Sequence, residues 1–227
     1  YSLGQAEVDR LQEQIAQAMK AQRIRGKRPR LLQKMHSERK QHFDNAEQLL
    51  AAYRTTDTQV RSLLAPVLPD LPLRPLQIQP VGPGRALTAS AASYQPAAHG
   101  SDEPGLLLIN THGLDQRPRW AVTMQYLHEG IPGHHLQLGL RQDGVSLPRF
   151  RRHTGDTAFV EGWGLYAETL GLELGLYQQP YELIGYLHGN LVRSARIVAD
   201  TGLHAQGWSR QQAAQYLVEQ ADMSPAE

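Results

Sequence analysis

Apolar residues recur at intervals of three and four along much of the chain, a spacing that places them on one face of an α-helix. Near the N-terminus this pattern covers residues 5–21, and a second amphipathic stretch covers residues 45–65. Four prolines then end the helical pattern, namely Pro66, Pro69, Pro72 and Pro75. We therefore expect a helical N-terminal segment, residues 1–67, followed by a differently organised region, residues 68–227.

Short strand patterns follow within residues 76–111. Residues 76–81 alternate like an edge strand, and residues 92–96 are a second candidate. Residues 105–111, Gly-Leu-Leu-Leu-Ile-Asn-Thr, form a short apolar run bounded by Pro-Gly and His-Gly, which is typical of a strand. Helical patterns return afterwards, at residues 119–127, 157–176 and 180–205. The predicted fold class is α+β, mainly α-helical with a small mixed or antiparallel sheet.

Composition narrows the function classes. The formal net charge of +1 argues against a dedicated nucleic-acid binder, and the lack of cysteine excludes disulfides and thiolate metal sites. No run of about 18 apolar residues is present, so we expect no membrane span. Because the chain begins and ends without obvious termini, we expect a fragment of a longer protein. The compartment and the oligomeric state stay open.

A basic stretch, residues 23–40, carries Arg23, Arg25, Lys27, Arg28, Arg30, Lys34, Arg39 and Lys40. Gly26 and Pro29 predict a loop here. We favour a solvated connection between helices, because the stretch lacks the interleaved aromatic residues that stack on bases. The alternative is a helical interaction module that binds nucleic acid or acidic lipid.

The densest cluster of reactive side chains is residues 128–135, His-Glu-Gly-Ile-Pro-Gly-His-His. In a zinc peptidase, two histidines four residues apart on a helix bind the metal, and the glutamate after the first acts as general base on a metal-activated water. Here the residue four after His128 is Pro132. On a regular helix His134 would point roughly 120° away from His128, and His135 would lie about 10 Å further along the axis.

Glycine and proline residues within the cluster can interrupt the regular helix that would keep the second histidine away from His128. Gly130, Pro132 and Gly133 are residues that break helical regularity through a kink or a π-type bulge. We interpret the insert as a distortion that returns the second histidine to the metal.

These residues resemble the signature of the bacterial family DUF885, close to H-E-G-x-P-G-H-H-x-Q, which residues 128–137 match. The resemblance extends to Pro104-Gly105 with Asn110-Thr111, to residues 158–168 and to residues 193–204. The family looks like a relative of the gluzincin metallopeptidases, in which a glutamate on a later helix is the third zinc ligand. The resemblance therefore implies a zincin-like helical domain that binds Zn²⁺ and hydrolyses a peptide substrate.

The resemblance also implies roles for single residues. His128 would be the first ligand, Glu129 the general base and Glu161 the third ligand. The second ligand is His134 or His135. The ending Gly133-His134-His135 resembles that of the zinc helix in related gluzincins and favours His134, whereas helical phase favours His135, and the other histidine would line the substrate cleft or support the ligands.

Further candidates lie on the later helices. Glu168 follows Glu161 by seven residues, on the same helix face, where it would orient a ligand histidine or face solvent. A stripe of ionisable residues, Arg193, Arg196, Asp200 and His204, is either a solvated face or a cleft wall. The resemblance favours a wall on which His204 stabilises the oxyanion and Arg193 or Arg196 holds a substrate carboxylate. Tyr166 is a further candidate donor to the oxyanion.

The predicted function is zinc-dependent hydrolysis of peptide bonds, with the site between the sheet edge and the helices carrying His128, Glu161 and His204. Two histidines and one glutamate leave a fourth position for water, as in catalytic zinc sites. We expect residues 105–111 to be either an edge strand that pairs with the extended substrate or an ordinary core strand. The alternative function is a metal-binding DUF885-type protein without peptidase activity.

Overall fold

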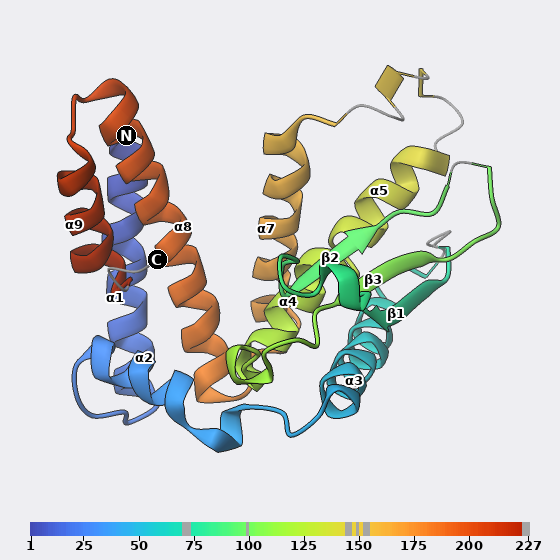
Figure 1. The fold of residues 1–227 in the computed structure, drawn as a ribbon, viewed down its shortest axis with the longest axis horizontal. Coiled ribbons are helices and arrows are strands. Elements are labelled where there is room, and N and C mark those ends of the chain that lie inside the picture. Colours follow the sequence, from blue (N-terminus) through green and yellow to red (C-terminus); the bar gives the residue numbers. More distant parts are fainter. Residues whose placement is uncertain (70–73, 99, 144–146, 149, 152–154, 224–227) are drawn as a thin grey trace. The chain divides into compact units, whose positions relative to one another are not determined.

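The computed structural model describes residues 1–69, 74–98, 100–143, 147–148, 150–151 and 155–223. They form two compact units, and each is treated by itself (Figure 1). The first unit combines the two ends of the chain, residues 1–38 and 178–227, and the second unit is residues 39–177. The boundary expected after residue 67 falls inside the second unit. The sequence-based division into a helical and a peptidase-like region stays a prediction.

The first unit is helical. It contains α1 (Ser2–Ala21), α2 (Arg28–Ser37), α8 (Pro180–Ala205) and α9 (Arg210–Ala221), and α8 packs against both α1 and α9 (Figure 1). The stripe predicted on α1 is buried, at Val8, Leu11, Ile15 and Met19. Ser209 begins α9 with a capping box, in which its side chain accepts from Gln212 and the Gln212 side chain accepts from the Ser209 N–H.

The loop predicted for the basic stretch is wrong, because α2 occupies residues 28–37. Pro29 lies in the first turn of α2, where its missing N–H costs nothing. Leu31, Leu32 and Met35 are buried and give α2 an apolar face. Among the basic residues, Arg28 pairs with Asp222 and Lys34 with Glu38, so part of the positive charge is neutralised within this unit.

The second unit contains α3 (Ala46–Leu64), β1 (Leu76–Pro80), β2 (Ala92–Gln95), β3 (Gly105–Ile109), α4 (Val122–Glu129), α5 (His134–Asp143) and α7 (Thr157–Glu173). Short 3₁₀ turns lie at Arg39–Gln41, Pro83–Arg85, Leu114–Gln116 and Arg119–Ala121. Asn45 caps α3 by accepting from the N–H of Gln48, and Asp156 caps α7 by accepting from Ala158 and Phe159. The mainly helical α+β class with a small sheet is confirmed.

The sheet is mixed and has the order β1-β3-β2 (Figure 1). β1 is parallel to β3, with Ile78 opposite Leu107, and β2 is antiparallel to β3, with Tyr94 also opposite Leu107. β3 is therefore the central strand, so of the two alternatives for residues 105–111 the core strand is the one found and the edge strand is not. Its continuous apolar run fits a strand that is paired on both sides. β1 and β2 are the edges.

The core of the second unit holds α4 in place. Leu107 and Ile109 of β3 pack with Tyr53 and Val60 of α3 and with Leu127 of α4, all nearly inaccessible to solvent. α4 also contacts β2 and α7. The residue that follows Leu127 is His128, so the reactive cluster begins directly after the buried part of α4. Among the described residues, no helix combines the length and hydropathy needed to cross a membrane.

Candidate metal site and its surroundings

The helix that carries His128 is interrupted after Glu129. α4 ends at Glu129, residues 130–133 form a turn that includes a cis peptide bond between Ile131 and Pro132, and α5 begins at His134. The N–H of His135 donates to the carbonyl of Gly130 at 3.1 Å, which links the two helices across the turn. A Cβ on Gly133 would lie 1.9 Å from the carbonyl oxygen of His128, so a larger residue does not fit there.

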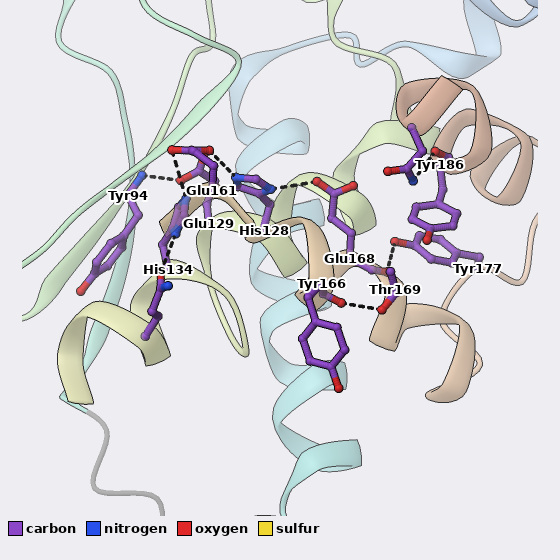
Figure 2. A network of polar contacts seen from close by, with 12 residues as sticks. Tyr94, His128, Glu129, His134, Glu161, Tyr166, Glu168, Thr169, Tyr177 and Tyr186 are labelled. Atoms are coloured by element: carbon purple, nitrogen blue, oxygen red, sulfur yellow. Dashed lines mark hydrogen bonds and ion pairs between the residues drawn. The ribbon is translucent and has the colours of Figure 1, made fainter. Parts of the chain in front are cut away.

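This interruption brings His134 beside His128. The two imidazole rings lie 4.7 Å apart between centroids, at an interplanar angle of 88°. The third member is Glu161 from α7, whose carboxylate oxygens lie 3.4 Å from Nε2 of His128 and 3.9 Å from Nε2 of His134 (Figure 2). One ligand atom from each of the three residues lies within 4.8 Å of the other two. The group could therefore hold a metal ion.

Hydrogen bonds fix both imidazoles with Nε2 toward Glu161. Nδ1 of His128 donates to the buried carboxylate of Glu168 at 2.8 Å. Nδ1 of His134 lies 3.3 Å from the side-chain oxygen of Gln137, whose amide donates to the carbonyl of Phe159. With the proton on Nδ1, each Nε2 offers its lone pair to the same point, which is the tautomer a metal ligand requires.

The surroundings also keep His134 unprotonated. Burial lowers the pKa of His134, and the neighbouring His128 lowers it further. A neutral imidazole is the form that binds a metal. Two imidazoles and one carboxylate are a donor set that suits zinc, so the residues present fit the metal that the sequence implies.

Glu129 lies beside this group and points toward β2. Its carboxylate accepts from the backbone N–H of Tyr94 at 2.8 Å (Figure 2). Burial raises the pKa of Glu129 to about 7, against the opposing effects of His128 and of the Tyr94 N–H. The carboxyl group is thus held by an edge strand next to the potential metal ligands.

α7 approaches α4 closely because it has small residues at the contact. A Cβ on Gly164 would lie 2.6 Å from the His128 ring, and one on Gly171 would lie 2.7 Å from Leu127. Gly164 and Glu168 are three and seven residues after Glu161, on the same face of α7. One helix face therefore supplies a potential ligand, the space for a ring and the acceptor that orients that ring.

His135 is turned away from the group. It is 1% exposed, its Nε2 donates to the carbonyl of Arg74 at 2.9 Å, and its Nδ1 lies 3.1 Å from the hydroxyl of Tyr94. Both ring nitrogens are thus used in linking α5 to β2 and to the segment before β1. Of the two histidines left open by the sequence, the structure brings His134 to His128 and Glu161.

Among the remaining predicted residues, Tyr166 belongs to the same compact unit as the group but not to the group itself. Tyr166 is 52% exposed, its ring lies 5.6 Å from that of Trp163 at a tilted angle of 53°, and it points away from His128 and Glu161 (Figure 2). Arg193, Arg196 and His204 lie on α8, in the first compact unit. Arg196 and His204 are exposed, and Nε2 of His204 lies 3.5 Å from the carboxylate of Asp200.

Two residues that orient the side chains of the site were not predicted from the sequence. Gln137 orients His134, and its signals are its place as the last residue of the signature in residues 128–137 and its position three residues after that histidine on the same helix face. Tyr94 acts through its backbone, which no side-chain pattern reveals. By contrast, the periodicity of α7 was enough to suggest Glu168.

Comparisons with known proteins place these observations in a family. The profile of DUF885, described as bacterial protein of unknown function, matches residues 1–227. A solved structure described as "the putative lipoprotein from Colwellia psychrerythraea" is 29% identical, with a TM-score of 0.90, and the match covers 99% of this chain and 40% of that one. A "putative lipoprotein of unknown function from Shewanella oneidensis" is 19% identical with a TM-score of 0.74, over 100% and 43% of the two chains, and supports the fold alone.

The chain thus spans less than half of each of these two proteins. No curated protein matches its sequence.

Proposed function

The chain belongs to the DUF885 family of bacterial proteins, and we propose that it acts as a zinc-dependent peptidase. The observation that carries the proposal is the convergence of His128, His134 and Glu161 beside the buried carboxyl group of Glu129. Two imidazoles and one carboxylate leave room for water and substrate, as catalytic rather than structural zinc sites do.

The ligands would hold zinc, which polarises a scissile carbonyl and makes water a stronger nucleophile near neutral pH. Glu129 would accept a proton from the attacking water and pass it to the leaving amine. The hydrogen bond from Tyr94 holds its carboxylate in place for that transfer. Glu168 and Gln137 would keep the two imidazoles in the ligating tautomer.

The extended substrate would lie along β2. β2 is an edge of the sheet, and its Tyr94 N–H already donates to Glu129, so this strand runs directly beside the proposed base. A peptide could add to such an edge through main-chain hydrogen bonds. This assigns to β2 the part that the sequence suggested for residues 105–111.

The roles expected of the other candidates stay predictions. His204 would stabilise the oxyanion, Arg193 or Arg196 would hold a substrate carboxylate, and Tyr166 would be an auxiliary donor. His135 would support the substrate side of the site by fixing the Tyr94 hydroxyl.

Metal content tests the first half of the proposal. Protein purified without added metal and then incubated with zinc should contain about one zinc per chain by elemental mass spectrometry, because the three ligands converge on one point. His128→Ala should abolish this stoichiometry. Equal zinc in both proteins would show that the ion binds elsewhere.

Turnover of Glu129→Gln tests the second half. The variant should retain zinc and lose hydrolysis of peptides by at least about 100-fold, because general-base catalysis contributes factors of that order. A variant with zinc bound and unchanged turnover would leave a metal-binding protein with another mechanism. A wild type that binds zinc and cleaves no peptide would favour a metal-binding role without peptidase activity.

A further inference from the structure

A second feature of the same unit is a largely apolar pocket between α5 and α7. Its volume is about 660 Å³, within the range of small-molecule sites. Its apolar lining comprises Leu136, Leu140, Leu147, Phe159 and Trp163. Leu140 is 43% and Phe159 63% exposed, so the pocket keeps apolar side chains in contact with solvent. Apolar surface of this kind is stabilised by covering it with an apolar ligand group.

The polar groups of the pocket favour an anion. Arg141 and Arg151 contribute two guanidinium groups. Nε of Arg141 is buried, and within the described part of the chain it has no hydrogen-bond acceptor. The carboxylate of Asp156 also lines the pocket, but it already accepts from the backbone N–H groups of Ala158 and Phe159. A ligand carboxylate in the pocket would give the Arg141 guanidinium group a charged acceptor.

The pocket shares a wall with the metal site. Gln137 lines the pocket and also orients His134. Trp163 lines it and donates from Nε1 to the carbonyl of Pro132, within the turn between α4 and α5, at 2.8 Å. Phe159 and Trp163 lie two residues before and after Glu161 on α7. A group bound in the pocket is thus one side chain away from a potential metal ligand.

We propose that this pocket binds the C-terminal residue of a peptide whose last side chain is large and apolar, with Arg141 donating to the terminal carboxylate. The apolar walls select the side chain, and the guanidinium group selects the free acid. That the ligand is a peptide rests on the proposed function, whereas binding of an apolar carboxylate rests on the pocket alone. Arg141 offers this carboxylate site within the unit that holds the proposed metal ligands, whereas Arg193 and Arg196 lie on α8.

Isothermal titration calorimetry on the zinc-treated protein tests the ligand chemistry. N-acetyl-L-phenylalanine should bind at least about 10-fold more tightly than N-acetyl-L-alanine, because the phenyl group covers apolar surface. It should also bind about 10-fold more tightly than N-acetyl-L-phenylalaninamide, which lacks the charged acceptor. Equal affinity for the acid and the amide would overturn the role of Arg141. Phenylacetate that binds as tightly as N-acetyl-L-phenylalanine would overturn the assignment to a peptide terminus.

Matched variants locate the binding. Arg141→Met keeps the aliphatic stem and should weaken binding of the acid about 10-fold without changing the affinity for the amide, whereas Arg210→Met, at an exposed arginine of α9, should leave both unchanged. Leu140→Asp should abolish binding by placing a negative charge in the pocket, and Leu172→Asp, at a comparably exposed leucine of α7, should not. Binding that survives Leu140→Asp would place the ligand elsewhere.

Calorimetry on His128→Ala separates this inference from the proposed function. The pocket lining does not include His128, so this variant should still bind N-acetyl-L-phenylalanine. If the wild type binds no zinc and cleaves no peptide yet shows the expected preferences, the peptidase proposal fails and the apolar carboxylate site stands. If zinc binds and peptides are cleaved without these preferences, the pocket proposal fails alone.

Discussion

The orientation of the His128 ring is determined by three individual residues of α7. His128 has Glu168 on its Nδ1, Glu161 near its Nε2 and Gly164 against its face. Because Nδ1 and the ring face are held by α7, the direction of Nε2 depends on how closely α7 approaches α4. The position without a side chain, Gly164, therefore matters as much to the site as the charged residues do.

Replacing Gly164 by alanine should weaken zinc binding strongly, by about 10-fold or more, because its Cβ would lie 2.6 Å from the His128 ring and force the ring or the helix to move. Gly162→Ala is the matched control, since a Cβ there meets nothing within 4 Å. It should leave zinc affinity unchanged and raise the free energy of unfolding by up to about 1 kcal/mol through helix propensity. Zinc titration against a chelator and thermal melts check both, and equal zinc affinity in the two variants would contradict the packing argument.

Glu168→Gln should keep the shape of the contact between residue 168 and Nδ1 of His128 and remove its negative charge. We expect zinc affinity to fall about 10-fold or more, because a carboxylate that accepts from Nδ1 makes the imidazole a better ligand. Glu173→Gln, at an exposed carboxylate of the same helix, should have no effect. Competition titration with a zinc chelator gives both affinities, and an unchanged value for Glu168→Gln would show that the hydrogen bond only fixes the ring.

At the level of elements, the features that depend on local sequence could be predicted. The helix break after Glu129 was predictable because Gly130, Pro132 and Gly133 oppose a regular helix, and the three strands were visible as short apolar or alternating runs. The choice between His134 and His135 was not predictable from phase, because phase is lost across a turn. Only the actual path of residues 130–133 shows which ring faces Glu161.

Sheet order and α2 escaped prediction for a different reason. A strand's position in a sheet depends on partners distant in sequence, so the same apolar run fits an edge or a centre. β3 became central through a parallel pairing with β1 that no local signal specifies. In α2, Pro29 suggested a loop, yet a proline is tolerated in a first helical turn, and burial of Leu31, Leu32 and Met35 favoured the helix.

The turn between α4 and α5 should not tolerate a side chain at position 133. Gly133→Ala would place a Cβ 1.9 Å from one backbone carbonyl oxygen and 2.3 Å from another, contacts that only backbone movement can relieve. We expect a loss of about 3 kcal/mol or more in the free energy of unfolding. Gly139→Ala in α5, where a Cβ meets nothing within 4 Å, is the control and should be neutral or stabilising. Urea denaturation of both variants decides, and similar midpoints would refute the close approach.

For the whole molecule, the metal site and the chain ends belong to different compact units. The second unit, residues 39–177, contains β2, the apolar pocket and the site residues His128, Glu129, His134 and Glu161. The other unit joins residues 1–38 to residues 178–227, so its stability depends on helices far apart in sequence. This unit can therefore be tested through a group of its own, without touching the site.

His188 on α8 is such a group. It is partly buried, and its Nε2–H donates to the carbonyl of Ala221 at 2.9 Å. Burial lowers the pKa of His188 from 6.5, and the nearby Arg28 and His36 act in the same direction, while the hydrogen bond to Ala221 and the charge of Asp222 oppose them. The unfolded chain therefore binds a proton at a higher pH than the folded chain does.

Because the unfolded state takes up this proton first, stability should be full above the unfolded pKa of 6.5 and should fall as the pH drops from there toward the lowered folded pKa. Over the interval from pH 8 to pH 5, the urea midpoint of the wild type should therefore fall relative to that of His188→Gln, which has no group to titrate at this position. The comparison isolates His188, because Glu129, whose raised pKa acts in the opposite direction, titrates in both proteins. Parallel pH profiles for the two proteins would show that His188 does not stay neutral in the fold, and a steeper profile for the variant would reverse the sign of the argument.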